Sequence, residues 1–411
     1  MRHADVDALE CRLADFMDNV GSALGSRPQR KRFAQYALGL LLPGERKSME
    51  PMAARIDPEH AMARFKTFQH FIACSTWDDL AVRQAAYRWA EPGLVQAGPM
   101  VAWIVDDTGF LKKGTHSVFV QRQYTGSAGK VCNCQVAVSL SVATATLSMP
   151  LDFELYMPES WAEDWGRRGE AKVPQDLMFR TKPEIALELI EQALSDGVAP
   201  APVVVDTGYG ANKAFRTALD QLGLEYVAEV AANTKVIAVG RQLPKAMSVR
   251  TLGAKLRRRA FKRVTWREGT RGPMMSHFAM RRGRLRAQRE ETSPPGGDLV
   301  LLVEWPEHES APSKYWLAKM HETRTLEELV SLAHSRWRIE RDYEDLKEEL
   351  GLDHYEGRSY VGWNHHVSVC LAAYAFLLRE RALGFPPGAA RFEPLAPTAA
   401  QGRPRGSAAA A

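Results

Sequence analysis

The order of strand-like and helix-like segments between residues 101 and 230 is the feature that most limits how this chain can fold. Three strand-like runs with Gly-containing turns between them come first, at 101–105, 117–123 and 131–142. Helices and apolar strands then alternate, at 182–197, 203–205, 211–222 and 224–230. Three antiparallel strands followed by this alternation predict an α/β unit built on a mixed five-stranded sheet with flanking helices.

This order is typical of the RNase H-like fold. In a minimal fold of that kind a closing helix follows soon after the last strand, whereas here a long helix is expected only at 326–350. We therefore expect a core formed by 98–230 and 326–383, interrupted by a β-containing insertion domain at 231–325. The stretch 151–170 contains Pro, Trp and acids, and it is expected to be an irregular excursion.

The two ends of the chain differ from this core in composition. Residues 1–97 have apolar positions at helical spacing and predict an all-α domain for DNA binding or dimerisation. Residues 384–411 are rich in Ala, Pro and Gly and predict a disordered tail. The sequence has no run of 18 apolar residues and no secretory signal, and its five scattered cysteines fit a reducing compartment. We therefore expect a cytoplasmic protein that does not bind membranes.

Lys and Arg are concentrated in one segment, although the net charge of the chain is only +5. Between Lys245 and Arg289, fifteen basic residues stand against a single acid, Glu268. Such a segment indicates a polyanionic partner such as nucleic acid. Its candidate phosphate contacts are Arg257, Arg258 and Arg259. The alternative is a solvated basic face without a ligand.

Three acidic residues occupy positions that suit a metal-dependent nuclease. Asp106 follows the first strand-like run and Asp206 follows the run 203–205, and these strands are neighbours in the expected sheet. Glu340 lies in the expected long helix, with Arg336 and Lys347 on the same face as candidate contacts to DNA phosphates. Hard cations prefer carboxylate oxygens, and two of them can act together on a phosphodiester. We therefore predict that Asp106, Asp206 and Glu340 bind two Mg²⁺ or Mn²⁺ ions and catalyse phosphoryl transfer.

Other interpretations of these residues stay open. An Asp after a strand is commonly a turn residue or a helix N-cap. Asp107 is the alternative to Asp106, because successive strand residues point to opposite faces and only one of the two can face the metals. Glu340 also fits an exposed helix with ion pairs between successive turns. On that helix, Trp337 and Ile339 are expected to pack on the sheet.

The string RWRIERDYEDLK, at 336–347, resembles the glutamate motif of bacterial insertion-sequence transposases of the DDE superfamily. In their cut-and-paste branch the motif runs Tyr, Arg, Glu, Lys. Arg336, Glu340 and Lys347 match its last three positions, and Ala333 stands at the Tyr position. Longer strings resemble the insertion sequence 701 family, among them WIVDDTGFLKKG, RQYTGSAGKVCNCQVAVSL and VVVDTGYGANKAFR. The resemblance covers most of residues 30–380.

The resemblance implies an RNase H-like core, two divalent ions, and a homodimer that binds the inverted-repeat ends of its own element and target DNA. It implies cleavage at those ends and attack of the resulting 3′-OH on target DNA. The protein would then associate with the nucleoid while bound to DNA. Related enzymes release the second strand through a hairpin, with an aromatic residue stacked on a displaced base. Trp266 is our candidate for that residue, and the alternative is that Trp266 belongs to a hydrophobic core.

Other basic residues are further candidates for contacts with DNA phosphates. Lys112 and Lys113 lie in the turn after the first strand, and Arg358 lies in the loop after the glutamate helix; plain surface charge is the alternative for each. Two other functions are also weighed: a catalytically inactive, transposase-derived DNA-binding protein, and an RNase H-like structure-specific nuclease. The intact acidic set disfavours the first, and the large insertion disfavours the second.

Overall fold

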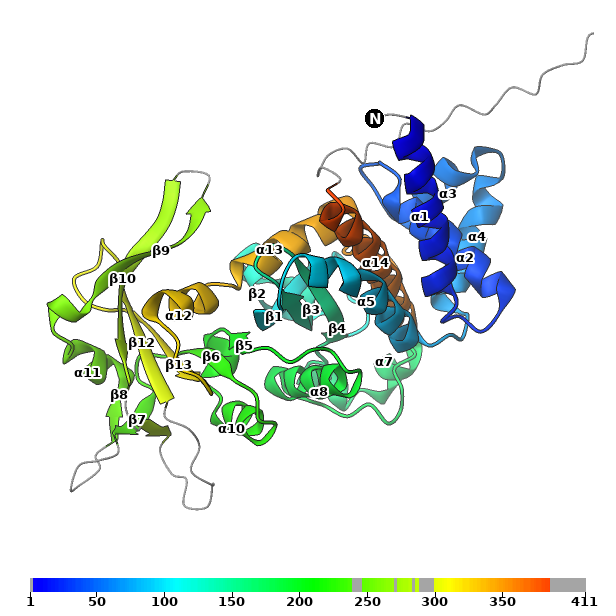
Figure 1. Cartoon of the computed structure of the whole chain (residues 1–411). Coiled ribbons are helices and arrows are strands. Elements are labelled where there is room, and N and C mark those ends of the chain that lie inside the picture. Colours follow the sequence, from blue (N-terminus) through cyan, green and yellow to red (C-terminus); the bar gives the residue numbers. More distant parts are fainter. Residues whose placement is uncertain (1–2, 239–245, 270–271, 283–284, 288–298, 385–411) are drawn as a thin grey trace, which may run out of the picture.

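The computed structural model describes residues 3–238, 246–269, 272–282, 285–287 and 299–384 of the 411-residue chain. Helices formed by the first hundred residues lie at one end of the molecule, and strands from the second half of the sequence lie at the other (Figure 1). Between them is a sheet with helices on both faces. None of the helices in these ranges is long and apolar enough to cross a membrane. The expected tail falls on residues 385–411, outside the described residues.

The first hundred residues form helices, as their apolar spacing predicts. These are α1 (His3–Gly21), α2 (Arg27–Leu41), α3 (Met49–Ile56), α4 (Ala61–Ala73) and α5 (Asp79–Gln96). Side-chain caps mark where helices begin: Ser26 and Gln29 form a capping box at α2, and Asp78 caps α5. These helices share a core with the C-terminal α14 (Tyr360–Ala382), since the ring of Phe16 contacts both Trp89 and Phe376.

The strand β1 (Ala102–Leu111) lies at the centre of the five core strands of the sheet. On one side it pairs antiparallel with β3 (Lys130–Ala143), which pairs in turn with β4 (Ser148–Leu155). On the other side it pairs parallel with β5 (Val203–Val205), and β5 pairs parallel with β6 (Tyr226–Val230). The resulting order β4-β3-β1-β5-β6 is the order expected of an RNase H-like sheet. Helices α8 (Lys182–Ser195) and α10 (Lys213–Gln221) cover one face.

Two predictions about this sheet are wrong. The stretch 151–170 is not irregular, because its first residues belong to β4 and α6 (Glu159–Ala162) and α7 (Trp165–Glu170) follow. The predicted run 117–123 contributes only the beginning of β2 (Gln121–Thr125), which pairs with β3 and not with β1. The 14-residue β3 is long enough to pair with β2 along its first part and with β4 along its second.

The segment 231–325 extends the sheet, so the predicted number of five strands is wrong. In the described part of the chain the sheet has ten strands, because four strands of this segment continue it beyond β6 in the order β13-β12-β10-β9. They are β13 (Lys314–Lys319), β12 (Leu299–Trp305), β10 (Gly272–Arg281) and β9 (Lys262–Gly269). The apolar run Tyr315–Ala318 in β13 pairs antiparallel with β6 and is buried there. The described part of the segment also contains two short helices and a small separate sheet: α11 (Val249–Ala254), η3 (Arg258–Ala260), β7 (Lys235–Ala238), β8 (Ala246–Ser248) and β11 (Leu285–Ala287).

The prediction of a single helix at 326–350 is also wrong, because the structure has separate helical elements there. Helix α12 (Leu326–Ala333) ends at His334, α13 (Trp337–Glu344) follows, and a π-helical turn, η4 (Asp345–Glu349), completes the segment. The two helices serve different parts of the twisted sheet, since α12 packs against β9 and β10 and α13 packs against β4. A straight helix would not follow both.

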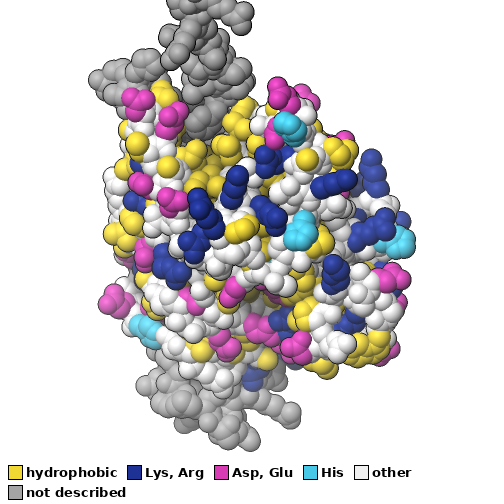
Figure 2. Space-filling model, turned by 90° about the vertical axis from the view of Figure 1, so that its right-hand side faces the viewer, with side chains coloured by type: hydrophobic (Ala, Val, Ile, Leu, Met, Phe, Trp, Pro, Cys, Tyr) yellow, Lys and Arg dark blue, Asp and Glu magenta, His cyan; other side chains and the backbone are white. Residues whose placement is uncertain are grey.

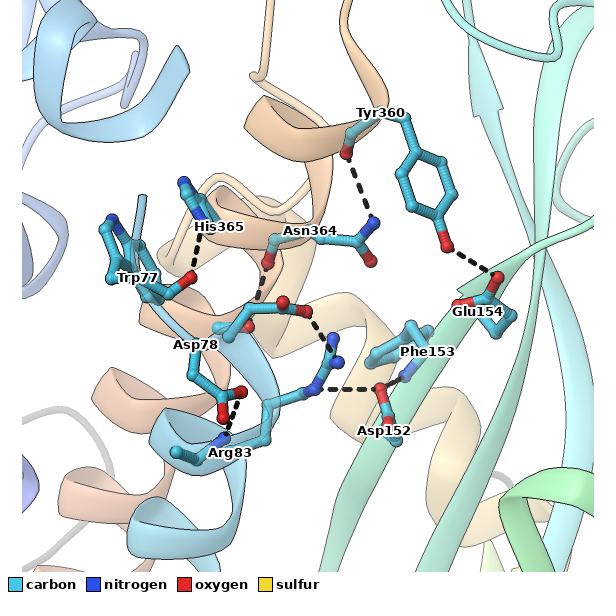
Figure 3. Close-up of polar contacts among 12 residues, drawn as sticks. Trp77, Asp78, Arg83, Asp152, Phe153, Glu154, Tyr360, Asn364 and His365 are labelled. Carbon is cyan, nitrogen blue, oxygen red and sulfur yellow. Dashed lines mark hydrogen bonds and ion pairs between the residues drawn. The ribbon is translucent and has the colours of Figure 1, made fainter. Parts of the chain in front are cut away.

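A buried group of charged side chains joins the N-terminal helices to the sheet (Figure 3). Arg83 of α5 contacts Asp79 on its own helix at 2.7 Å and Asp152 of β4 at 3.2 Å. Glu154, two residues further along β4, pairs with Arg180 and accepts a hydrogen bond of 2.9 Å from the Tyr360 hydroxyl of α14. The two acids within β4, Asp152 and Glu154, are therefore paired with arginines that are distant in the sequence.

Candidate active site

Asp106 and Asp206 lie side by side on neighbouring strands. Trp103 pairs with Val203 and Ile104 with Val204, and the same register carried forward sets Asp106 beside Asp206. Parallel neighbours are about 4.8 Å apart. The structure thus brings the two predicted acids together. It corrects one detail, because Asp106 lies in the middle of β1 and does not end it.

One oxygen of each carboxylate is held by backbone N–H groups. Oδ1 of Asp106 accepts a hydrogen bond of 2.9 Å from the N–H of Asp107. Oδ1 of Asp206 accepts from Gly208 at 2.9 Å and from Tyr209 at 3.4 Å, so Asp206 is the N-cap of the short helix α9 (Thr207–Gly210). The N-cap alternative is therefore realised, but it uses only one of the two oxygens of Asp206.

The other oxygens of the two carboxylates face one guanidinium group. A terminal nitrogen of Arg336 lies 2.9 Å from Oδ2 of Asp106 and 3.7 Å from Oδ2 of Asp206. Burial raises the pKa of Asp106, an effect that Arg336 opposes and Asp206 reinforces. Burial lowers the pKa of Arg336, but Asp106 and Asp206 outweigh it, and the net shift is upward. Two carboxylates this close together create a negative potential that stabilises a positively charged group between them.

A glycine fixes the turn that carries Asp206. A Cβ built on Gly210 would lie 2.0 Å from the backbone oxygen of Glu229 in β6. Only a residue without a side chain allows α9 to pack this closely on the neighbouring strand. The orientation of Asp206 is therefore set by the fold on both sides, by its N-cap hydrogen bonds and by the packing of α9.

Asp107 lies on the opposite face of the sheet from Asp106. Its Oδ2 is 2.7 Å from Nζ of Lys182, at the beginning of α8. Asp107 thus already has a cationic partner on the face covered by α8. Of the two alternatives that the sequence leaves open, the structure favours Asp106 as the residue that faces the candidate site.

Helix α13 and the turn after it hold three neighbours of Glu340 against the sheet. Arg336 contacts the aspartates, the Tyr343 hydroxyl lies 2.5 Å from Oγ of Ser139, and Nζ of Lys347 lies 2.7 Å from Oγ1 of Thr108. Glu340 itself is exposed. Within the described residues, no group of three or more Asp, Glu, His or Cys side chains is arranged to hold a metal ion. The structure therefore brings Asp106 and Asp206 together and does not bring Glu340 to them.

The two residues of α13 expected to pack on the sheet behave differently. Ile339 is fully buried, as predicted. Trp337 is only partly buried, and its ring lies beside the guanidinium groups of Arg267 and Arg338, at 4.6 and 5.2 Å from the ring centre. Trp337 therefore lies against β9, in the extension of the sheet beyond the core strands, and between two arginines.

The candidate DNA contacts separate into structural and surface residues. Nζ of Lys112 donates a hydrogen bond of 2.7 Å to the carbonyl of Tyr355, and burial lowers the pKa of Lys112, so this side chain anchors the loop after α13. Lys113 and Arg358 are exposed. Three further candidates are also exposed: Arg257, Arg258 and Arg259. The face formed by the N-terminal helices carries additional Lys and Arg side chains (Figure 2).

Trp266 packs within an aromatic cluster of the inserted strands. Its ring stacks on His334 at 4.2 Å and meets Phe278 edge-on at 5.7 Å. Burial lowers the pKa of His334 to about 4, so this imidazole is neutral. One face of the Trp266 ring is therefore covered by His334, which agrees with the core alternative.

Sequence reasoning missed one acid near the two aspartates. Glu229 lies on β6, where Val205 pairs with Ala228, so the next residue pair in register is Asp206 and Glu229. The signal in the sequence was an isolated acid within an otherwise apolar strand. A buried acid of this kind needs a polar or charged neighbour. The Glu229 side chain is hydrogen-bonded to Thr207, and the charge of Arg336, about a hundred residues away, opposes the rise in its pKa that burial causes.

Comparison with known proteins identifies the class to which this fold and site belong. Residues 19–273 match the family described as DDE superfamily endonuclease, and residues 180–376 match the transposase DDE domain. The first match covers more than half of the chain, so the protein belongs to the DDE superfamily of endonucleases. The chain is also 33% identical over 174 residues to the "Probable transposase for insertion sequence element IS701" of Microchaete diplosiphon. That similarity spans 42% of this chain and 42% of the relative. These matches confirm the resemblance to insertion-sequence DDE transposases.

Proposed function

We propose that this protein is the DNA transposase of an insertion sequence, which cleaves DNA at the ends of its element and joins them to target DNA. The observation that carries the proposal is the pair of Oδ2 atoms on Asp106 and Asp206 that face a single positive group. Membership in the DDE superfamily and the similarity to the probable transposase of insertion sequence element IS701 support the same function. The proposal includes cut-and-paste movement, binding to inverted-repeat ends and action as a homodimer.

The donor set fits hard divalent cations. Asp106 and Asp206 offer carboxylate oxygens from rigid positions, and Mg²⁺ and Mn²⁺ favour such ligands. These two residues, joined by Glu340, would hold two ions. When bound, the ions would lower the pKa of the attacking water and stabilise negative charge on the phosphate.

The chain's own residues would bind and orient the DNA. Lys347 is fixed against β1 by Thr108, so its charge lies at a defined place next to Asp106 on the same face. It would act as a point charge for a phosphate near the cleaved bond. The exposed Lys113, Arg358 and Arg257–Arg259 would contact phosphates further away. Trp266 remains our candidate for stacking on a displaced base, which would require the ring to leave His334.

A cleavage assay with the Glu340→Gln variant tests the proposed function. Purified protein is incubated with labelled element-end DNA and Mg²⁺, and cleavage and binding are measured separately. We expect Glu340→Gln to lose cleavage by about 10³-fold and to keep DNA binding, because it removes one ligand charge and little else. Glu348→Gln is the matched control, since Glu348 is also exposed and lies two turns further along.

The outcomes of this assay separate the candidate functions. Binding of the correct ends without cleavage by the wild-type protein would contradict the active enzyme and support the inactive DNA-binding protein. Cleavage of branched DNA regardless of end sequence would support the structure-specific nuclease. Full cleavage by Glu340→Gln would exclude Glu340 from the catalytic set.

A further inference from the structure

Glu229 is the acid next to the candidate active site that the proposed function does not use. It lies on β6 at the level of Asp206 on β5, and it is partly buried. Burial raises the pKa of Glu229, and Arg336 is the strongest opposing charge, ahead of Lys314. Asp106, Asp206 and Glu229 therefore form a row across three parallel strands, with Arg336 as the positive group common to all three.

The guanidinium group of Arg336 is not fully used by the two aspartates. One terminal nitrogen contacts both Oδ2 atoms, whereas Nε is buried and has no hydrogen-bond partner among the residues that the structure describes. A buried donor without a partner is costly, so an arrangement that satisfies it is favourable. Arg336 also directly precedes α13, next to the junction with α12, where the helical path is already broken.

Arg336 and a divalent cation would compete for the same oxygen atoms. The Oδ1 atoms of Asp106 and Asp206 are occupied by backbone N–H groups, so the Oδ2 atoms are the ones that face a ligand. Those are the atoms that Arg336 contacts. A guanidinium and a doubly charged ion at the same two carboxylates would repel each other. Metal binding therefore requires Arg336 to move.

We propose that Glu229 receives Arg336 when divalent cations bind to Asp106 and Asp206, so that Glu229 is a positioning residue that sets how readily the site takes up metal. This inference rests on the metal-dependent function proposed above. Other acids are less suitable acceptors. Asp107 lies on the opposite face with Lys182, and Glu304 is close to Lys314 and His334. Glu229 is the acid beside Asp206 on the same face, and its charge already acts on Arg336.

Binding of Mn²⁺ to the full-length protein, followed by the EPR signal of the free ion, tests the inference without measuring activity. We expect Arg336→Gln to bind Mn²⁺ about tenfold more tightly, because the competing charge is gone. We expect Glu229→Gln to bind it about tenfold more weakly, because Arg336 then keeps its place on the aspartates. In the Arg336→Gln background, Glu229→Gln should have an effect below about twofold, since no arginine remains to be received.

Controls separate this inference from the proposed function. Glu225→Gln removes the same charge just before β6, where Glu225 pairs with Arg324, and it should leave Mn²⁺ affinity unchanged. Binding that does not depend on Asp106, tested with Asp106→Asn, would overturn the proposed metal site and this inference together. A different result would overturn only the role of Glu229. In that case Mn²⁺ binding depends on Asp106, but Glu229→Gln either weakens it equally in the wild-type and Arg336→Gln backgrounds or has no effect in either. If Glu229→Gln does not fold, Arg336→Gln alone tests the inference. Mn²⁺ binding that is no tighter in Arg336→Gln would show that Arg336 and the cation do not compete for the aspartates.

Discussion

Asp106→Asn is expected to reduce Mg²⁺-dependent cleavage of element-end DNA by about 10³-fold or more. Metal ions contribute several kcal/mol of charge stabilisation in phosphoryl transfer, and each 1.36 kcal/mol corresponds to about a factor of ten in rate. Asn keeps the shape of the side chain and its hydrogen bond to the N–H of Asp107, but it lacks the charge. The variant is expected to fold, because a neutral residue suits this mostly buried position and Arg336 keeps Asp206 as a charged partner at 3.7 Å.

Asp107→Asn is the matched control for this experiment. It makes the same substitution one residue further along β1, on the face where Asp107 pairs with Lys182 at 2.7 Å. We expect cleavage within a few-fold of the wild-type rate and a loss of about 1 kcal/mol in stability or less, since both side chains are partly exposed. A large loss of cleavage in Asp107→Asn, with Asp106→Asn still active, would reverse the assignment of the two residues.

Arg83→Met is expected to lower the free energy of unfolding by about 3–5 kcal/mol, measured by urea denaturation. Arg83 is only 8% exposed, and it contacts Asp79 and Asp152 where α5 meets β4. Removing one partner of a buried ion pair leaves the other charge without compensation. Methionine fills a similar length, so the loss reflects charge more than volume. Arg88→Met, an exposed arginine on the same helix, is expected to change stability by less than about 0.5 kcal/mol.

The cost of Arg83→Met should grow with pH. Burial raises the pKa of Asp152 to about 7, and Arg83 opposes this shift. When folding raises the pKa of a carboxyl group, the folded protein becomes less stable as the pH rises from the unfolded pKa of that group to its folded pKa. Without Arg83 the folded pKa of Asp152 rises further, so this window extends above pH 7. Equal losses at pH 6 and pH 8 would contradict this account of Asp152.

The two aspartates of the site could be predicted from the sequence because each directly follows a short apolar run, which is a local pattern. Asp106 and Asp206 each belong to a short apolar strand, and the order of strands makes those two strands neighbours. The choice between Asp106 and Asp107 needed the structure, because alternation shows only that the two face opposite ways. The partner that decides it, Lys182, lies 75 residues away.

The predictions that failed depended on contacts between distant segments. Strand β4 was not predicted because Asp152 and Glu154 suggest an exposed segment. Only the structure shows that each is paired with a distant arginine, Arg83 or Arg180. The extension of the sheet depends on pairing between β6 and β13, about ninety residues apart, which no local pattern reports. Glu229 was missed for the same reason, since its importance comes from Arg336 and from the register of β5 and β6.

We propose that Asp106, Asp206 and Glu340 form one metal centre, and iron-directed cleavage of the polypeptide can locate that centre without an activity assay. Fe²⁺ replaces Mg²⁺ in the full-length protein, ascorbate and peroxide are added, and the fragments are identified by mass spectrometry. We expect cuts close to residues 106, 206 and 340 that disappear with excess Mg²⁺ and in Asp106→Asn. Cuts elsewhere, or cuts near 106 and 206 with none near 340, would contradict it.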